Sequence, residues 1–433
     1  MSEDVQQASA APANIRRERR RGSAAASLGT IAEYFDLTVY AYLAVVISPV
    51  FFPGNDPTAS LLATLAVFAT AYFMRPIGGI VFGRIGDRFG RKRAMVASII
   101  MMGLATIAMA ALPSYAAIGV LAPVLLVVAR LFQGLSAGGE IGGAMTYVFE
   151  LFGPGRRGMG AAFVVLGGIV GNAAAAIAVA VMSALTTAEQ MQTWGWRVAL
   201  LLGLPLLLLC LWMRTRISDT PEFTEAARRG ETAMSPLREV LRTHPKALLK
   251  LLGLAIAQNA GGYIVLTYVG IHLITVGGYD RTTVSWLSAG VILFTGLILT
   301  PLSGLLVDRF GVMRILATGL IMTALIAYPA LTLMTGSGLA VAAVAYVVLV
   351  LGIPLVQTAN AALFPSLFET RVRMTGLSFA FNIASVIAGG TAAYIATWLI
   401  RATGDARSPA YFVIAATLIG IATLTTVRTA GRD

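Results

Sequence analysis

The chain has 433 residues, of which 57% are hydrophobic and only 12% are charged, whereas soluble globular proteins carry about 25% charged residues. This composition excludes a soluble protein of about three domains, which the length alone would suggest. Apolar runs of about 20 residues recur along the whole chain, and each is long enough to cross a hydrocarbon layer about 30 Å thick. The sequence therefore predicts an all-α membrane protein with many spans.

The net charge of +12 does not indicate nucleic-acid binding, because the basic residues fall between apolar runs and not along one surface. In a twelve-span arrangement, 26 of the 32 lysines and arginines fall on the side that holds both chain ends. Basic loops favour the cytoplasm, so we expect a multi-pass protein of the cytoplasmic (inner) membrane with both termini inside. The single cysteine, Cys210, excludes an intramolecular disulfide and argues against a metal cluster.

Five segments follow one another along the chain. We expect a disordered cytoplasmic tail at 1–22, a six-helix bundle at 23–213, a charged cytoplasmic loop at 214–247, a second six-helix bundle at 248–427 and a C-terminal tail at 428–433. The expected spans lie at about 24–52, 59–83, 94–112, 116–149, 158–184, 197–213, 248–274, 284–306, 315–335, 338–364, 374–400 and 409–427.

The two bundles carry the same loop motif. Gly83, Asp87, Arg88, Phe89, Gly90 and Arg93 recur as Gly304, Asp308, Arg309, Phe310, Gly311 and Arg314, at a constant offset of 221 residues. A chain built from two related halves, with a solute path where the halves meet, is typical of secondary transporters.

The repeated motif predicts a conformational latch at the cytoplasmic ends of the spans. Gly83 and Gly90 allow a tight turn, while Asp87 and its arginines can pair with one another and with a helix end. Such contacts break when the two halves rock. The alternative is a charged turn that only sets topology. The complete set of latch candidates is Arg75, Gly83, Asp87, Arg88, Gly90, Arg91, Glu140, Asp308 and Arg309.

These motifs resemble the major facilitator superfamily, and within it the metabolite:proton symporter family. The resemblance covers nearly all of residues 24–427. It is carried by Glu33-Tyr34-Phe35-Asp36, Arg75-Pro76-Ile77-Gly78-Gly79, Arg130, Gln133, Gly134, Gly138, Gly139, Glu140, Gly195-Trp196-Arg197 and Asp219-Thr220-Pro221-Glu222-Phe223. It implies the twelve-helix fold of that superfamily. It also implies transport, by alternating access, of osmoprotectants, 2-oxoglutarate, citrate, shikimate or similar solutes.

Two acids in the first span are candidates for carrying a proton. Glu33 and Asp36 are three residues apart, share a helix face and lie near the middle of the span. A carboxylate at that depth is costly unless it is paired, protonated or facing water, and removal from water favours the protonated form. We assign proton coupling to Asp36, with Glu33 as its partner. The alternative is that both are permanently hydrogen-bonded structural groups.

Arg130 in the fourth span is the candidate for holding a solute carboxylate, since a guanidinium can donate two parallel hydrogen bonds. Gln133 lies one turn further on. The alternative for Arg130 is a standing salt bridge to Glu33 or Asp36. Uncharged polar side chains complete the expected solute site, although many such residues only join helices. The expected contacts are Arg130, Gln133, Tyr40, Asn259, Tyr263, Tyr268, Gln357 and Asn382.

We therefore expect a proton-coupled symporter for a small carboxylate or zwitterion, acting as a monomer in the lipid bilayer and needing no cofactor other than the proton. An antiporter exporting an amphipathic compound is the alternative, favoured by the apolar stretch 161–178. An enzyme is not expected, because no nucleophile or metal constellation stands at membrane depth. The GxGxxG match at 153–158 lies between spans and not after a strand, and no GxxxxGKS/T motif for ATP occurs.

Overall fold

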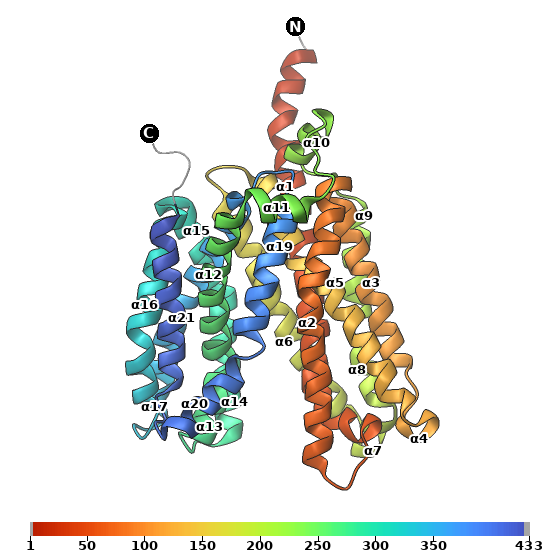
Figure 1. The fold of residues 1–433 in the computed structure, drawn as a ribbon, viewed down its shortest axis with the longest axis vertical. Helices are drawn as coiled ribbons and strands as arrows, with labels where there is room; N and C mark the ends of the chain where they lie inside the picture. The colour runs from red at the N-terminus through yellow and green to blue at the C-terminus, as the bar shows by residue number, and fades with distance from the viewer. Residues whose placement is uncertain (1–2, 428–433) are drawn as a thin grey trace.

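The structure is a computed structural model that describes the backbone of residues 3–427 and the side chains of 21–56, 59–280 and 283–427. Twelve helical segments within this part of the chain are long and apolar enough to cross a membrane. Figure 1 shows them as two groups of helices side by side, the first six spans on the right and the last six on the left. The all-α fold of two six-span halves is confirmed.

The first half runs from α1 to α9, and its sixth span is divided among short segments. The bounds are α1 Glu3–Phe51, α2 Pro57–Phe89, α3 Arg91–Ala111, α4 Tyr115–Ile118, α5 Leu121–Phe152, α6 Arg157–Leu185, α7 Ala188–Gln190, η1 Met191–Gly195, α8 Trp196–Leu201 and α9 Leu204–Thr215. The second half runs from α12 to α21. Its bounds are α12 Pro245–Tyr263, η2 Ile264–Tyr268, α13 Val269–Thr275, α14 Arg281–Phe294, η3 Thr295–Leu299, α15 Thr300–Phe310, α16 Val312–Leu333, α17 Leu339–Val350, α18 Gly352–Leu363, η4 Phe364–Leu367, α19 Arg373–Ala384, η5 Ser385–Gly389, α20 Ala392–Thr403 and α21 Pro409–Thr426.

Local sequence sets many of these boundaries. Pro205, Pro245 and Pro409 each occupy the first turn of a helix, where the missing N–H costs nothing. Gly90 and Gly311 separate α2 from α3 and α15 from α16 at φ values of 110° and 88°, which favour glycine. The two equivalent glycines of the repeated motif therefore make the same tight turn in both halves.

Four spans contain a π-helical segment, in which the backbone departs from the regular α pattern. Three of these segments, η2, η3 and η5, lie in the second half, and η1 lies in the first. Single π turns inside α-helices are frequent at functional sites. The spans of the second half that face the first half are thus less regular than α1, α2, α5 and α6.

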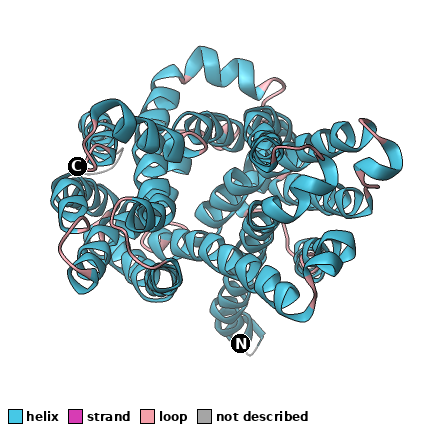
Figure 2. Ribbon diagram, turned by 90° about the horizontal axis from the view of Figure 1, so that it is seen from below, coloured by secondary structure: helices cyan, strands magenta, loops and turns pink. Residues whose placement is uncertain are grey.

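Both ends of the chain leave the molecule at the same end, which we call the terminal end; the other is the opposite end (Figure 1). The central segment also lies at the terminal end, and it contains two short helices, α10 Pro221–Arg228 and α11 Pro236–Thr243. The hydroxyl of Thr220 caps α10 by accepting a hydrogen bond from the Phe223 amide, at 3.4 Å. Figure 2, seen along the spans, shows helices of both halves packed around a common centre.

The structure differs from the sequence-based expectations at three places. Helix α1 already begins at Glu3, whereas a disordered tail was expected over 1–22. The sixth span begins at Ala188, about nine residues before the expected start, because Thr187 and Gln190 form a capping box ahead of the apolar run. The second span continues to Phe89, so Gly83 lies inside a helix and not in a turn.

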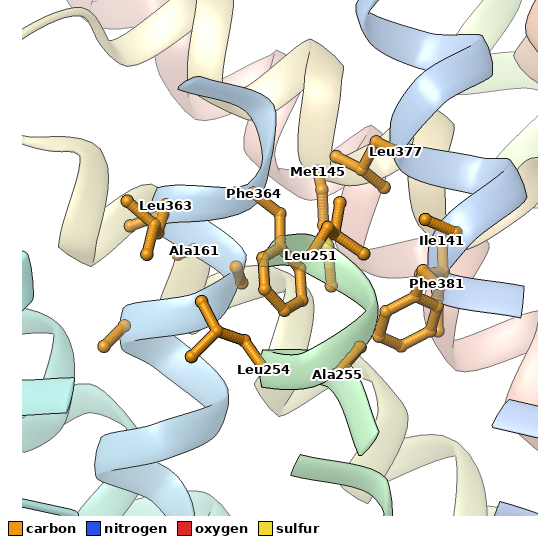
Figure 3. Close-up of a cluster of buried hydrophobic side chains, with 14 of the residues drawn as sticks. Ile141, Met145, Ala161, Leu251, Leu254, Ala255, Leu363, Phe364, Leu377 and Phe381 are labelled. Atoms are coloured by element: carbon orange, nitrogen blue, oxygen red, sulfur yellow. The ribbon is translucent and has the colours of Figure 1, made fainter. Parts of the chain in front are cut away.

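An apolar cluster joins the two halves near the terminal end. Figure 3 shows side chains from α5, α6, α12, α18, η4 and α19 packed against one another. The labelled residues are Ile141, Met145, Ala161, Leu251, Leu254, Ala255, Leu363, Phe364, Leu377 and Phe381. Since α5 and α6 belong to the first half and the others to the second, this cluster closes the terminal end between the halves.

Candidate functional site

Asp36 lies at the centre of a buried hydrogen-bonded group. It is 15 residues from either end of the span Arg21–Phe51 and is 4% exposed. The hydroxyl of Thr106 in α3 donates to its Oδ1 atom, and Nε2 of Gln133 in α5 donates to its Oδ2 atom at 2.6 Å. Both oxygens of the Asp36 carboxyl therefore have a donor, and three spans converge on it.

Gln133 connects Asp36 to Arg130. Its Oε1 atom accepts a hydrogen bond from Nη1 of Arg130 at 2.8 Å, and its Nε2 atom also approaches the Thr106 hydroxyl at 3.1 Å. Gln133 is 1% exposed. The salt bridge considered between Arg130 and Glu33 or Asp36 is not among the ion pairs of the described residues, because Gln133 stands between Arg130 and Asp36 and Glu33 pairs elsewhere.

Arg130 is fully buried, yet part of its guanidinium group is free. Its Nε and Nη2 atoms have no hydrogen-bond partner within the described residues. The Cζ atom lies 3.4 Å from the centre of the Tyr40 ring and 5.6 Å from that of Phe68. A buried guanidinium without an acid partner is costly, and the aromatic faces offset only part of that cost. The two free donors are therefore suited to hold an anionic ligand.

Glu33 forms a separate buried pair. Its Oε1 atom accepts from Nη2 of Arg75 in α2, and both side chains are almost completely buried. The second carboxyl oxygen of Glu33 has no partner within the described residues. Arg75 was expected in the latch; instead its charge neutralises Glu33 inside the first half, because both side chains point into the bundle. The carboxyl of Glu33 and that of Asp36 thus have different partners.

One pair of tyrosines joins the halves at mid-depth. The hydroxyls of Tyr72 in α2 and Tyr263 in α12 lie 3.1 Å apart, and the Cζ atom of Arg75 lies 5.0 Å from the Tyr72 ring. Tyr263 therefore reaches the first half, next to the Glu33–Arg75 pair. Among the solute contacts expected in the second half, Tyr263 is the residue that lies next to the buried charges of the first half.

The other expected contacts of the second half mostly bind neighbouring helices. Asn259 donates to the Ala255 carbonyl at 2.8 Å and accepts from Ser385 at 3.3 Å. Gln357 lies against Gly262, and Tyr268 is buried in an apolar cluster. Asn382 donates to the Gly138 carbonyl of α5 at 2.7 Å, so in this conformation it joins the halves.

The two aspartates of the repeated motif, predicted to act as a latch, bind helix ends of the opposite half at the terminal end. Asp87 accepts from the amides of Met374 and Thr375 in the first turn of α19, at 3.1 and 2.8 Å. Asp308 accepts from the amides of Gly158 and Met159 in the first turn of α6, at 2.7 and 3.0 Å. Each carboxylate thus binds the amides at the start of a helix in the other half.

A network of ion pairs surrounds Asp87. Arg91 pairs with Asp87 at 2.7 Å and with Glu150 at 3.0 Å, and it donates to the Thr370 carbonyl at 2.6 Å. Arg373 of α19 pairs with Glu150 at 2.8 Å and with Glu222 of α10 at 2.6 Å. The central segment and both halves are therefore tied together by charges at the terminal end.

Four further latch candidates, Glu140, Arg88, Arg309 and Gly83, are not part of this network of ion pairs. Glu140 pairs with Arg214 inside the first half, together with the Ser98 hydroxyl. Arg88 and Arg309 each lie over the ring of the phenylalanine that follows, at 5.1 and 5.3 Å. Gly83 packs within α2 against Thr375 of α19. Counting residues along a span gave the depth of each group but not the face on which it lies.

Three functional residues were missed at the level of sequence. Thr106 is one of two hydroxyl side chains in the third span, with Ser98, and nothing in its neighbourhood indicated Asp36. Arg214 was counted with the central loop, although it is fully buried at the end of α9. Glu150 had one signal, since Phe149-Glu150 repeats as Phe368-Glu369 in the second half.

Comparisons with known proteins identify the family of the chain. The profile described as "Major Facilitator Superfamily" matches residues 24–390. The "Proline/betaine transporter" of Salmonella typhimurium is 33% identical over 413 residues, covering 93% of this chain and 82% of that protein. The "Inner membrane metabolite transport protein YhjE" of Escherichia coli is 37% identical over 422 residues, covering 95% of this chain and 94% of that protein.

The structure of the proton:xylose symporter XylE bound to 6-bromo-6-deoxy-D-glucose superposes with a TM-score of 0.75 at 18% identity, covering 95% of each chain. At that identity the likeness bears on the fold. Fold and site together define a multi-pass membrane transporter. The chain belongs to the major facilitator superfamily. It is a secondary transporter of small solutes and not an enzyme.

Proposed function

We propose that this transporter is a proton symporter that imports a small zwitterion or monocarboxylate across the bacterial inner membrane by alternating access. The solute carboxylate binds Arg130 between the halves, and Asp36 carries the coupling proton. The opposite end faces the exterior and the terminal end faces the cytoplasm, in keeping with the excess of lysine and arginine at the terminal end.

The observation that carries the proposal is the unpartnered part of the Arg130 guanidinium. Nε and Nη2 form the edge of the group that can hold a carboxylate by two parallel hydrogen bonds, and both are free. Arg130 lies nine residues from the opposite end of its span Leu121–Phe152, about 14 Å deep. The Tyr40 and Phe68 rings lie 3.4 and 5.6 Å from Cζ of Arg130, and the Nε and Nη2 donors have no hydrogen-bond acceptor within the described residues.

Asp36 is suited to carry the proton because it is buried beside this site without a cationic partner in hydrogen-bond contact. Its two donors, Thr106 and Gln133, are neutral. A neutral environment allows the carboxyl to exist in either protonation state, whereas the Glu33 carboxylate is held by Arg75. The proton coupling is therefore assigned to Asp36, with Glu33 as a structural partner of Arg75.

The names of the relatives support the class of solute. Two of them are a proline/betaine transporter and an inner membrane metabolite transport protein. Proline and betaine each carry one carboxylate and one cationic nitrogen. Arg130 suits the carboxylate of such a solute.

The test is uptake of L-proline and glycine betaine into liposomes that contain the purified protein. With an acidic exterior and a neutral lumen, wild type should accumulate one of these solutes faster than without a gradient. Arg130→Gln should abolish binding and uptake. Asp36→Asn should lose the acceleration by the gradient but keep exchange of internal for external solute. Arg401→Gln, at an exposed position of α20, is the control for loss of a positive charge.

Two outcomes would contradict the proposal. Gradient-driven uptake that persists in Asp36→Asn would remove the proton from Asp36. Movement of solute outward as protons move inward would establish an antiporter in place of a symporter.

A further inference from the structure

The amide of Gln133 has an orientation that its two neighbours fix. On one side stands Arg130, which has only hydrogen-bond donors, and on the other stands the Asp36 carboxylate, which has only acceptors. Oε1 therefore faces Nη1 of Arg130 and Nε2 faces Oδ2 of Asp36, at 2.8 and 2.6 Å. All three side chains are at most 4% exposed, so water does not substitute for either contact.

This arrangement is compatible with one protonation state of Asp36. If Oδ2 of Asp36 takes up a proton, its hydroxyl is a donor that points at the Nε2 donor of Gln133. Two buried donors that face each other make no hydrogen bond, and each incurs the full desolvation penalty of an unsatisfied polar group. Rotation about the last torsion of a glutamine side chain is soft and nearly two-fold. A half-turn of the amide gives the Asp36 hydroxyl an acceptor, Oε1.

The half-turn of the Gln133 amide changes the hydrogen-bond partner of Arg130. Nη1 of Arg130 loses its acceptor, and the Nε2 donor of Gln133 turns toward it. The Nε and Nη2 atoms of Arg130 are already without partners, so the protonated state has three unpaired donors of Arg130 and an amide N–H₂ group at one place. One carboxylate takes two donors on one edge of a guanidinium, so a solute carboxylate can bind Nε with Nη2, or Nη2 with Nη1, and on the second edge it also meets the amide N–H₂ group of Gln133.

We propose that Gln133 is the positioning residue that couples the proton to the solute, by turning its amide between Asp36 and Arg130. Protonation of Asp36 at Oδ2 moves Oε1 from Arg130 to Asp36 and prepares the carboxylate site. Release of the solute returns Oε1 to Arg130, and the proton leaves Asp36 for water on the side that is then open. This inference rests on the proposed function and deepens it, because it assigns the link between the two sites.

The test follows the Gln133 carbonyl without any solute. Protein labelled with ¹³C at the glutamine side-chain carbonyl is measured by infrared difference spectroscopy between mildly alkaline and mildly acidic pH. Wild type should show a shift of one carboxamide band, as its carbonyl exchanges a guanidinium partner for a carboxylic acid. The shift should be absent in Gln133→Leu and in Asp36→Asn. Gln258→Leu, which removes a glutamine paired with Asn360 in the second half, should leave it intact.

A band that does not move on acidification overturns the proposal, because it means that Gln133 keeps Arg130 while the Thr106 hydroxyl turns to accept the acid proton. This readout is independent of the solute. A band shift in a protein that shows no proton-driven uptake would contradict the proposed symport and leave the amide half-turn supported.

A second measurement separates coupling from packing. The affinity of wild type for L-proline should rise at least about fivefold from alkaline to acidic pH, the lower bound of usual coupling between sites. In Gln133→Leu the affinity should be the same at both pH values. An equal fold-change with pH in both proteins would assign Gln133 a packing role and overturn the proposal.

Discussion

Asp87 and Asp308 make the same contact in opposite directions across the molecule. Asp87 of the first half binds the first-turn amides of α19 in the second half, and Asp308 of the second half binds those of α6 in the first. Asp87 also pairs with Arg91, four residues on, where the second half has Val312. The reciprocal latch is therefore symmetric in its helix contacts and asymmetric in its ion pairs.

The first prediction concerns this asymmetry. Asp308→Asn should weaken closure of the terminal end by about 1 kcal/mol, the usual size of a carboxylate–helix-end interaction. Asp87→Asn should weaken it more, because it also leaves Arg91 with one carboxylate fewer. Spin labels at Arg93→Cys and Arg314→Cys, exposed on the two halves, report the opening as a longer interspin distance. An equal effect of both substitutions would contradict the asymmetry.

The second prediction concerns the close approach of α2 and α19. A Cβ atom at Gly83 would lie 2.6 Å from the Cα atom of Thr375, so Gly83→Ala should keep the terminal end from closing. Solute uptake should fall while the protein remains folded, since alanine itself favours a helix. Gly103→Ala is the matched control, because its Cβ meets only Leu207 at 3.9 Å. Normal uptake in Gly83→Ala would show that this contact does not limit transport.

The third prediction concerns the Glu33–Arg75 pair. Glu33→Gln leaves the Arg75 guanidinium buried without a counter-charge, and an arginine cannot lose its proton. The free energy of unfolding of the protein in detergent should fall by about 3–5 kcal/mol, which a thermal unfolding experiment measures. The double variant Glu33→Gln with Arg75→Gln should recover most of that loss. Additive effects of the two single substitutions would show that the pair is not coupled.

The fourth prediction concerns the ring beneath Arg130. Tyr40→Leu removes an aromatic face worth about 1–2 kcal/mol to a desolvated cation, so solute affinity should fall about tenfold. Tyr40→Phe keeps the face and loses the hydroxyl, which contacts the Thr64 carbonyl at 3.3 Å. Binding assays at one pH compare the two variants. Similar losses in both would assign the effect to the hydroxyl.

The fifth prediction tests the orientation in the membrane. Cys210 is fully buried, so wild type should not react with a maleimide that cannot cross membranes. In intact cells Ser337→Cys, exposed between α16 and α17 at the opposite end, should react. Met234→Cys, exposed between α10 and α11 at the terminal end, should react only after the cells are opened. The reverse pattern would place the terminal end outside.

The sequence was sufficient for the spans and for the helix-end contacts of Asp87 and Asp308, because both depend on local signals; the role of these contacts as a latch stays a prediction. Apolar length defines a span whatever it packs against, and the repeated Asp87 and Asp308 motifs sit at corresponding helix ends. The partners of buried charges were not accessible in the same way. Depth along a span placed Glu33, Asp36 and Arg130 near the middle and Arg75 about eight residues from the cytoplasmic end, but pairing depends on the rotation of each helix about its axis.

Two residues illustrate this limit. The guanidinium of Arg75 was expected to face the loop and turned out to face Glu33. Asp36 was considered as an ion-pair partner of Arg130, whereas the structure inserts Gln133 between them and adds Thr106 from a third helix. A rotation of one helix by a single residue would change the partners of Arg75 and Asp36 but not the number or spacing of apolar residues in the sequence. Composition and periodicity therefore carry no information about these partners.

The uneven distribution of π-helical segments has a mechanical consequence. The first half has one π-helical segment, η1, and its buried pairs Glu33–Arg75 and Glu140–Arg214 lie on α-helical stretches outside it, although Pro76 removes one backbone donor from α2. The second half interrupts three of its spans at η2, η3 and η5, where the backbone hydrogen bonding is already irregular. Elastic deformation during a transport cycle should therefore concentrate in the second half, while the charged half moves as a stiff block.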